Sequence, residues 1–413
     1  MKRLLAAFAL IVLMANVGFA NPTEYEKLKV FAKVMAIIEN NYVDKVSQTK
    51  LIDDAIKGMV SSLDPHSSYM TKEEYKELKI TTTGKFGGLG MVVSMKDGIL
   101  TVVSPIEDTP AYKAGIKAGD AIIKINGEST LGMTLEQAVK LLRGKPGTKV
   151  TITILRKNSK KPFDLTITRA IIHVKSVKFK KYGNIGYIRI TQFQSGTTKE
   201  LKSALDKLKG ISGLVIDLRN DPGGLLREAI GVCDVFIKKG VIVSIRGRSK
   251  NDVQYFYAHD DKNEPSYPIV VLINAGTASA AEIVSGCLKD HHRAIIMGIR
   301  SFGKGSVQSI IPLGDGSALR LTTARYYTPS GKSIQAVGIK PDIVVKQAKI
   351  VEEESNSYSL RESDLIHHLN NPQAKKTKKT LDFEKELKND YQLLRAIELI
   401  KAEDLVCKTR QSQ

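Results

Sequence analysis

The sequence predicts a multidomain α/β protein with an α/β core, an inserted β-rich module and helical regions at both ends. Its 413 residues exceed one typical domain. Between residues 183 and 298, aliphatic runs alternate with helical patterns, which is typical of an α/β layer. Between residues 84 and 169, short strand-like runs are separated by glycine turns instead, which indicates a compact β-rich module.

The first twenty residues have the three parts of a secretory signal. Lys2 and Arg3 precede an apolar run over 4–17, and Gly18-Phe19-Ala20 is a small-x-small cleavage site. The run is shorter than the roughly 20 residues that span a bilayer. We therefore expect a signal peptide over 1–20 and export to the periplasm or another extracytoplasmic compartment. An uncleaved anchor in the inner membrane is the alternative.

The remaining elements follow from hydrophobic spacing. Apolar residues three and four apart predict helices within 22–62, the second from Gln48 to Leu63, so we assign 21–81 to an N-terminal helical region. The β-rich module occupies 82–169, with a hairpin turn at 95–98 and a helix over 134–144.

The α/β core is assigned to 170–345, and a C-terminal linker and helical region to 346–413. Core strands are expected at 183–190, 213–218, 268–274 and 294–298, and core helices at 197–209, 225–238 and 279–289. The polar stretch 350–378 is expected to be loosely ordered, and 381–402 to be a helix. The terminal helices are candidates for self-association into a homo-oligomer.

Composition limits the classes of function. The net charge of +20 is compatible with nucleic acid or an anionic membrane surface as a partner. Aromatic residues make up 6% of the chain, however, and there is no Trp for base stacking. The one dense basic run is KKTKK at 375–379. We interpret the charge as a solvated basic face and expect no nucleic acid, while membrane-surface association stays open.

The glycine turn Gly88-Leu89-Gly90-Met91 enters a strand rather than a helix, so it does not suit a nucleotide. Its backbone N–H groups could instead bind a carboxylate, with the strand edge taking up an extended peptide. This turn and the motif PAxxAGIxxGDxIxxING at 110–127 resemble the PDZ domains of bacterial proteases. The resemblance implies that the module binds C-terminal tails of protein substrates; a β-module without a ligand is the alternative.

The stretch 270–285 ends a strand in small residues that include two hydroxyls, Thr277 and Ser279. It is either a plain strand-to-helix turn or the display of a nucleophile that needs a base from elsewhere. None of the seven histidines lies in a positioning motif, and GxSxG is absent. The three cysteines lie far apart without CxxC spacing, so neither metal binding nor cysteine catalysis is expected.

Lysine is the other candidate base. Lys304 is flanked by Gly303 and Gly305 and followed by an apolar strand, and burial of a lysine lowers its pKa until its neutral form can accept a proton. The turn Pro222-Gly223-Gly224 follows another strand, and its bare N–H groups could bind an oxyanion together with that of Ala280. A simple strand-ending turn is the alternative there.

NAGTASAAEI followed by GKGSVQ, with LDPHSSYM at 63–70 and DLRNDPGGLL at 217–226, resembles the C-terminal processing peptidases, a family of serine-lysine proteases. The resemblance covers roughly residues 1–345. It implies a ClpP/crotonase-like core, Ser279 as nucleophile, Lys304 as general base and Gln308 as the residue that orients the lysine. It also implies Gly224 or Gly223 as oxyanion donor, with Gly224 preferred, and no metal or cofactor.

This chain departs from the family pattern at three positions: Thr277 and Ala281 stand where Ser is common, and Asp221 where Asn is common. The carboxylate of Asp221 either assists the reaction or caps the turn. Glu282 and Arg219 are candidates for supporting roles only. The sequence thus predicts a secreted serine endopeptidase that recognises unfolded C-terminal segments. A PDZ adaptor on a degenerate protease scaffold is the rival function.

Overall fold

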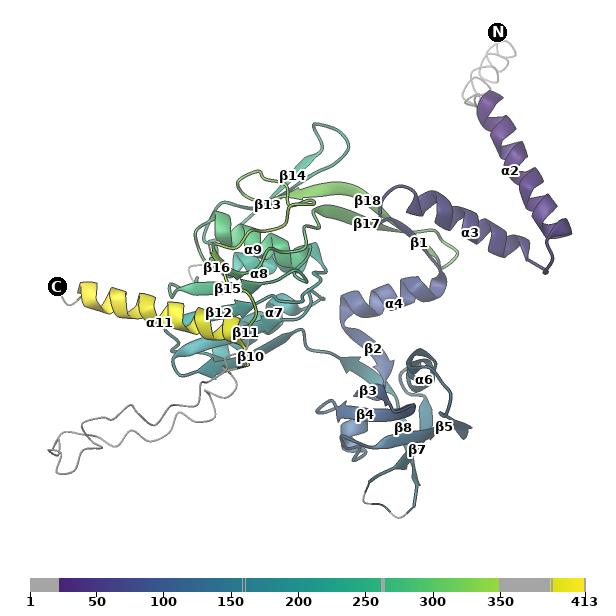
Figure 1. The fold of residues 1–413 in the computed structure, drawn as a ribbon, viewed down its shortest axis with the longest axis horizontal. Coiled ribbons are helices and arrows are strands. Elements are labelled where there is room, and N and C mark those ends of the chain that lie inside the picture. The colour runs from purple at the N-terminus through teal and green to yellow at the C-terminus, as the bar shows by residue number, and fades with distance from the viewer. Residues whose placement is uncertain are drawn as a thin grey trace, which may run out of the picture. The chain divides into compact units, whose positions relative to one another are not determined.

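The computed structural model describes residues 22–157, 159, 161–260, 264–348, 387 and 389–411. The predicted signal peptide and the polar stretch 350–378 lie outside these residues. The chain divides into two compact units, one of residues 1–72 and 308–322, the other of residues 73–307 and 323–413. Figure 1 shows the elements of both. The prediction of a multidomain α/β protein is confirmed.

The smaller unit holds the two predicted N-terminal helices, α2 (Pro22–Asn41) and α3 (Gln48–Ser61). The side chain of Ser47 accepts a hydrogen bond from the backbone of Lys50 and so caps α3. In the same unit β1 (Ser68–Met70) pairs antiparallel with Ala318–Arg320, the first residues of β18 (Ala318–Tyr327). The second helix ends two residues before the predicted Leu63, where the chain turns towards Pro65.

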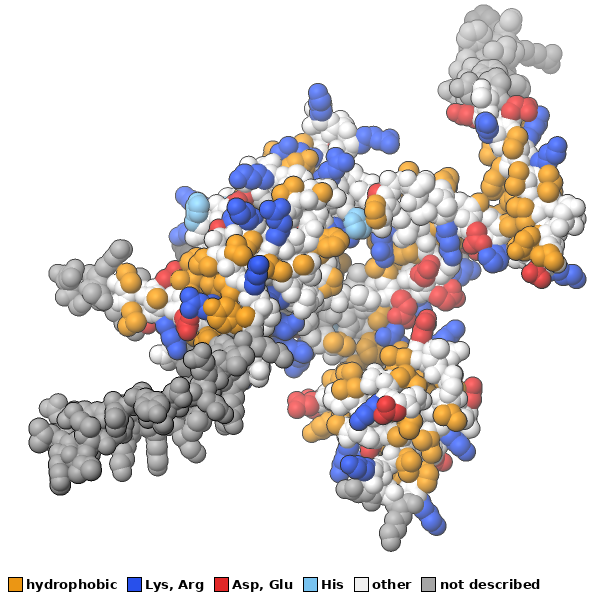
Figure 2. All heavy atoms as spheres, viewed as in Figure 1, with side chains coloured by type: hydrophobic (Ala, Val, Ile, Leu, Met, Phe, Trp, Pro, Cys, Tyr) orange, Lys and Arg blue, Asp and Glu red, His pale blue; other side chains and the backbone are white. Residues whose placement is uncertain are grey.

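An apolar stripe lies exposed along α2, and Figure 2 shows hydrophobic side chains gathered over this helix. Its members are Tyr25, Leu28, Phe31, Val34 and Ile37. No helix among the described residues is both long enough and apolar enough to cross a bilayer.

The larger unit is built on a six-stranded sheet in the order β10-β11-β12-β15-β16-β19. Neighbouring strands from β11 to β19 run parallel, and β10 is antiparallel to β11. The central strands β12 and β15 are buried throughout, which requires continuous aliphatic runs such as IVVLI. The strands are β10 (Val177–Tyr182), β11 (Ile185–Ile190), β12 (Gly213–Asp217), β15 (Ile269–Ile273), β16 (Ile295–Gly298) and β19 (Ile343–Val344).

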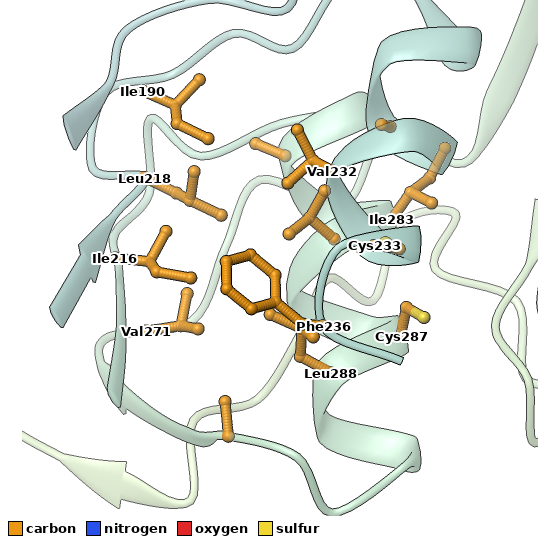
Figure 3. Packing of buried hydrophobic residues seen from close by; sticks show 14 of the residues in the cluster. Ile190, Ile216, Leu218, Val232, Cys233, Phe236, Val271, Ile283, Cys287 and Leu288 are labelled. Carbon is orange, nitrogen blue, oxygen red and sulfur yellow. The ribbon is translucent and has the colours of Figure 1, made fainter. Parts of the chain in front are cut away.

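Helices cover both faces of this sheet. One face packs against α7 (Thr197–Lys207), α8 (Leu226–Asp234) and α9 (Ala280–Asp290), and Figure 3 shows Phe236 among the side chains of this layer. The thiols of Cys233 and Cys287 lie fully buried there, and burial raises the pKa of Cys233 well above its usual value. The opposite face packs against α11 (Tyr391–Gln411).

The β-rich module has its own core and a sheet in the order β3-β4-β5-β7-β8, so β3 is an edge strand. The predicted hairpin turn joins β3 and β4, with positive φ at Asp97 and Gly98. The predicted helix is α6 (Leu135–Leu142), which Thr134 and Gln137 close with a capping box. Short strands β2 (Lys85–Gly88) and β9 (Ala170–His173) pair where the module joins the core. Its own strands are β3 (Met91–Lys96), β4 (Ile99–Pro105), β5 (Ala121–Ile125), β6 (Glu128–Ser129), β7 (Lys149–Leu155) and β8 (Phe163–Thr168), with the short helix α5 (Pro110–Lys113).

Several elements differ from the prediction. The helix α4 (Lys72–Thr83) and the hairpin of β13 (Val241–Arg246) and β14 (Val253–Tyr257) were not predicted. The side chains of α4 and β14 are largely exposed, whereas β13 is an apolar strand with buried residues. The predicted helix over 381–402 is interrupted at residues 389–390, and α11 begins at Tyr391, where the side chain of Asp390 accepts the backbone N–H of Leu393. Residues 381–386 and 388 lie outside the described residues.

The last part of β18 pairs with β13, and the strand β17 (Ser306–Pro312) precedes β18 in the chain.

Candidate active site

Two turns meet at the carboxyl ends of the adjacent parallel strands β12 and β15, the edge where α/β sheets bind ligands. The turn after β12 covers residues 218–225, and the turn after β15 covers residues 274–279. The hydroxyl of Thr277 donates to the carbonyl of Leu218 at 2.7 Å, and the N–H of Ala278 donates to that of Asp221 at 2.9 Å. The structure therefore brings together the predicted nucleophile and the predicted oxyanion donors.

Ser279 is the residue immediately before α9, and its backbone is strained. Its φ of 54° and ψ of −115° lie in a region that residues with a Cβ rarely adopt. Such a conformation costs on the order of 1–3 kcal/mol and persists only where the surroundings enforce it. The residue is 7% exposed, and it stands at the positive end of the α9 dipole. This placement suits a nucleophilic hydroxyl, because the helix dipole favours the negative charge that forms on the carbonyl oxygen of an attacked substrate.

Gly223 lies against the start of α9. A Cβ at this position would come within 2.7 Å of the nitrogen of Ala280 and 2.9 Å of the Cβ of Ser279, and its φ is +92°. Gly224 has a φ of +147°, and a Cβ there would overlap the carbonyl of Phe193. Both glycines are therefore required by close approach as well as by backbone conformation.

The N–H groups of these residues have different partners. The N–H of Gly223 donates to Oδ1 of Asp221 at 2.8 Å. Among the described residues, no acceptor takes the N–H of Gly224 or of Ala280. Two free N–H groups close to a serine are the arrangement that stabilises a tetrahedral oxyanion. The preference for Gly224 over Gly223 as oxyanion donor stays a prediction.

Asp221 is fully buried, and burial raises the pKa of its carboxyl to about 8. The hydrogen bond from Gly223 and the charge of Arg189 oppose this rise, whereas the charge of Asp217 adds to it. Oδ2 has no hydrogen-bond partner among the described residues. Asp221 therefore caps the turn and is mostly protonated at neutral pH.

Lys304 lies in an irregular segment before β17 and is partly buried. Its backbone N–H donates to Oε2 of Glu282 at 2.8 Å, and the N–H of Ser279 donates to the same oxygen at 2.9 Å. The flanking glycines permit close packing, because a Cβ at Gly305 would lie 2.6 Å from the nitrogen of Gln335. The backbones of the predicted nucleophile and base are thus held side by side.

Gln308 belongs to the smaller unit. Its Nε2 donates to the hydroxyl of Thr322 at 3.3 Å, and that hydroxyl donates to Asp64 at 3.1 Å. Asp64 is part of the LDPHSSYM block that the sequence singled out, and Ser67 of the same block accepts the N–H of Thr322. The role of Gln308 in orienting the lysine stays a prediction.

Sequence reasoning missed Tyr326, whose side chain hydrogen-bonds that of Ser279. Burial raises the pKa of Tyr326 to about 12, although the hydrogen bond from Ser279 opposes the rise. Only the alternation of β18 distinguishes the buried Tyr326 from its neighbour Tyr327. Arg219 lies in the turn after β12, but its guanidinium binds Asp217 and Asp390 and so ties the C-terminal segment to β12.

The predicted carboxylate-binding loop lies between β2 and β3. The carbonyl of Leu89 accepts the N–H of Ala111, and that of Gly90 accepts the N–H of Ile106. The N–H groups of Leu89 and Gly90 have no acceptor among the described residues. With Gly88 before them and Met91 opening the edge strand β3, these groups suit the binding of a terminal carboxylate beside an added strand.

The part of the chain that the structure describes contains no group of three or more His, Cys, Asp or Glu side chains arranged to hold a metal ion. The expectation of chemistry without a metal or cofactor stays a prediction.

Comparison with known proteins agrees with this geometry. The family model for peptidase family S41 matches residues 184–345, a PDZ domain model matches 101–156, and the model for the activating protease CtpB N-terminal domain matches 14–74. A carboxy-terminal-processing protease of Bartonella bacilliformis is 47% identical over 407 residues, covering 96% of this chain and 93% of that protein. A probable CtpA-like serine protease of Staphylococcus epidermidis is 41% identical over 334 residues, covering 80% of this chain and 67% of that protein.

Among solved structures, the photosystem II D1 C-terminal processing protease is 30% identical with a TM-score of 0.45, covering 76% of this chain and 92% of that chain. The relative that is 47% identical over nearly the whole chain, together with the family model, shows that the chain belongs to peptidase family S41 and is a serine protease of the carboxy-terminal-processing type with a PDZ domain.

Proposed function

We propose that the chain is an exported endopeptidase that captures the C-terminal end of an unfolded protein through its PDZ domain and cleaves it by a Ser279–Lys304 mechanism. The observation that carries the proposal is the meeting of a strained Ser279 with two unoccupied N–H groups, those of Gly224 and Ala280. Strain at a serine that begins a helix is a recurring property of nucleophiles.

In this mechanism the hydroxyl of Ser279 attacks the scissile carbonyl carbon and transfers its proton to neutral Lys304. The carbonyl oxygen becomes an oxyanion that accepts hydrogen bonds from Gly224 and Ala280. The intermediate collapses as the protonated lysine donates its proton to the departing amine. Neutral Lys304 then takes a proton from water, whose oxygen attacks the acyl carbon to form a second tetrahedral intermediate. This intermediate collapses as the protonated lysine returns the proton to the Ser279 oxygen, which releases the carboxyl product and the free serine. We assign to Gln308 the role of orienting the side chain of Lys304.

Tyr326 is the other group that contacts the nucleophile, but it does not suit the role of base. With a pKa near 12, its hydroxyl remains protonated at neutral pH and cannot take up the serine proton. We assign to it a hydrogen bond that holds the Ser279 side chain.

Substrate capture rests on the PDZ loop. A free carboxylate at the end of a peptide accepts from the N–H groups of Leu89 and Gly90 while the peptide pairs with the edge strand β3. Export rests on the sequence of residues 1–20. Self-association is assigned to α2, because its exposed apolar stripe in the smaller unit suits a second copy of the helix.

The test compares the wild type with Ser279→Ala and Lys304→Ala on an unfolded protein and on a peptide with a free C-terminus. Both variants are expected to lose at least ~10³-fold in kcat/KM. The same peptide with an amidated C-terminus is expected to bind ~10-fold more weakly to all three proteins. New termini identified by mass spectrometry give the cleavage sites. Undiminished cleavage by Ser279→Ala contradicts the mechanism, and absence of cleavage by the wild type favours the rival function of a PDZ adaptor.

A further inference from the structure

One buried carboxylate joins the nucleophile to the segment that carries the base. Glu282 lies in the first turn of α9 and is 0% exposed. Its Oε2 accepts the N–H groups of Ser279 at 2.9 Å and Lys304 at 2.8 Å. Its Oε1 accepts the N–H of Gly303 at 2.7 Å and the hydroxyl of Ser301 at 2.6 Å. Four donors thus converge on two oxygens.

The energetics of this cluster favour rigidity. Each oxygen serves two donors, which is the capacity that an ionised carboxylate offers. Hydrogen bonds to a charged group are roughly twice as strong as those between neutral groups. The first turn of α9 also supplies the positive end of the helix dipole.

Residues 299–305 are hydrogen-bonded to residues 335–339 and to Tyr326, but what places them against the nucleophile is their bonding to α9 and to the turn before it. Ser279 has a strained backbone that its surroundings must enforce. Residues 299–305 belong to neither helix nor strand. Besides Glu282, a hydrogen bond from the N–H of Phe302 to the carbonyl of Thr277, 3.0 Å long, connects this segment to the nucleophile turn. Glu282 and this bond together therefore set the position of the lysine backbone relative to the serine.

We propose that Glu282 is the positioning residue that fixes the separation of nucleophile and base. This inference rests on the proposed Ser279–Lys304 mechanism. Proton transfer needs the serine oxygen and the lysine nitrogen within about 2.6–3.2 Å of each other. A lysine side chain has four rotatable bonds, so its reach is defined only when its backbone is fixed. A displacement of about 1 Å can reduce the rate ~10²-fold.

Glu282→Gln tests the role with a side chain of the same shape. An amide has one acceptor oxygen, and its NH₂ group is a donor. In either orientation the NH₂ group faces two donors, either Ser279 and Lys304 or Gly303 and Ser301. One or two of the four hydrogen bonds are lost, because the Ser301 hydroxyl is the one group of the four that can turn to accept from the NH₂ group, and the segment moves away from α9. We expect kcat to fall ~10²-fold and KM to change less than threefold, because the PDZ loop is untouched.

The matched control is Glu200→Gln. Glu200 is also a largely buried carboxylate that ties a helix to another segment: its Oε2 accepts the N–H and hydroxyl of Ser176 and the N–H of Val177. It joins α7 to β10, away from the two turns. This variant is expected to lower the melting temperature and to keep kcat within twofold of the wild type.

The experiment measures kcat, KM and the melting temperature of the full chain on a free C-terminal peptide from pH 6 to pH 9.5. The expected result for Glu282→Gln is the fall in kcat together with a shift of the acidic limb of the kcat profile, because that limb reports the base. A wild-type kcat and an unshifted limb overturn the inference. So does an equal loss of kcat in Glu200→Gln.

Ser301→Ala is the substitute test if Glu282→Gln does not fold. The alanine removes one hydrogen-bond donor to Oε1 of Glu282 and leaves the carboxylate in place. We expect a fall in kcat of about fivefold, and an unchanged kcat overturns the inference.

Ser279→Ala separates the proposed Ser279–Lys304 mechanism from the proposed role of Glu282. If that variant is active, the proposed mechanism fails. If it is inactive while Glu282→Gln and Ser301→Ala behave as wild type, only the role of Glu282 fails.

Discussion

The turns after β12 and β15 occupy equivalent positions on neighbouring strands, yet they handle backbone strain in opposite ways. The turn after β12 has its positive φ angles at Asn220, Gly223 and Gly224, residue types that tolerate them with little strain. The turn after β15 places Ser279 at a φ of 54°. The first turn offers only backbone N–H groups, so it needs no side chain. The second must present a hydroxyl, so it cannot use glycine and must bear the strain.

The largest expected effect comes from giving the first turn a side chain. In Gly223→Ala the new Cβ collides with the nitrogen of Ala280 and meets an unfavourable φ, so the oxyanion donor is displaced. We expect kcat to fall ~10²–10³-fold in peptide hydrolysis. Gly210→Ala is the control, because Gly210 has a φ of +75° with nothing within 4 Å of its Cβ position. If both variants lose the same activity, strain alone explains the result.

The next effect concerns the charge beside the first turn. Burial chiefly raises the pKa of Asp221 from the ordinary 3.8 of an aspartate to about 8. Above pH 8 its carboxylate places a negative charge close to the developing oxyanion, so wild-type kcat is expected to fall ~10-fold by pH 9.0. Asp221→Asn should abolish this alkaline limb in a kcat profile. A limb that persists in the variant shows that another group causes it.

Asp221 also makes stability depend on pH. The folded chain holds the proton up to about pH 8, whereas the unfolded chain releases it near pH 4. The free energy of unfolding therefore declines as pH rises between these values. Denaturant titrations should show the decline in the wild type and a flatter dependence in Asp221→Asn, with a difference of a few kcal/mol at most, about 1.4 kcal/mol for each unit of pKa shift.

A smaller effect is expected from the hydroxyl that ties the two turns together. Thr277→Val keeps the shape and removes the bonds to the carbonyl of Leu218 and the N–H of Asn274, both at a buried position. We expect a loss of about 1–3 kcal/mol in the free energy of unfolding and a kcat within threefold of the wild type. A loss of kcat beyond tenfold would show that Thr277 takes part in the chemistry.

The smallest effect measures the strain itself. Ser279→Gly and Ser279→Ala are both expected to be inactive, but glycine tolerates the backbone of this position and alanine does not. We expect Ser279→Gly to be more stable than Ser279→Ala by about 1 kcal/mol, the reverse of their usual order in a helix. Equal melting temperatures would show that the strain relaxes in the variants.

The sequence by itself determined the α/β class, the two N-terminal helices, the PDZ module and the strand-turn blocks that contain Ser279, Gly223 and Lys304. These features depend on local periodicity and on short motifs, which a single sequence displays directly. It also set Thr277 apart from Ser279, and the structure shows Thr277 bonded to the backbone of the neighbouring turn.

Only the tertiary structure decided which partners these groups have. The sequence left the role of Asp221 open, and the structure shows that its side chain caps the turn by accepting the N–H of Gly223. Glu282 was one of two supporting candidates, and Arg219 the other; their separation comes from contacts over 19 to 171 positions along the chain. Tyr326 gave no signal, because its contact with Ser279 exists only once β18 is placed beside α9. Hydrophobic periodicity predicts on which face of a helix or strand a residue lies, but only long-range packing determines which residues that face contacts.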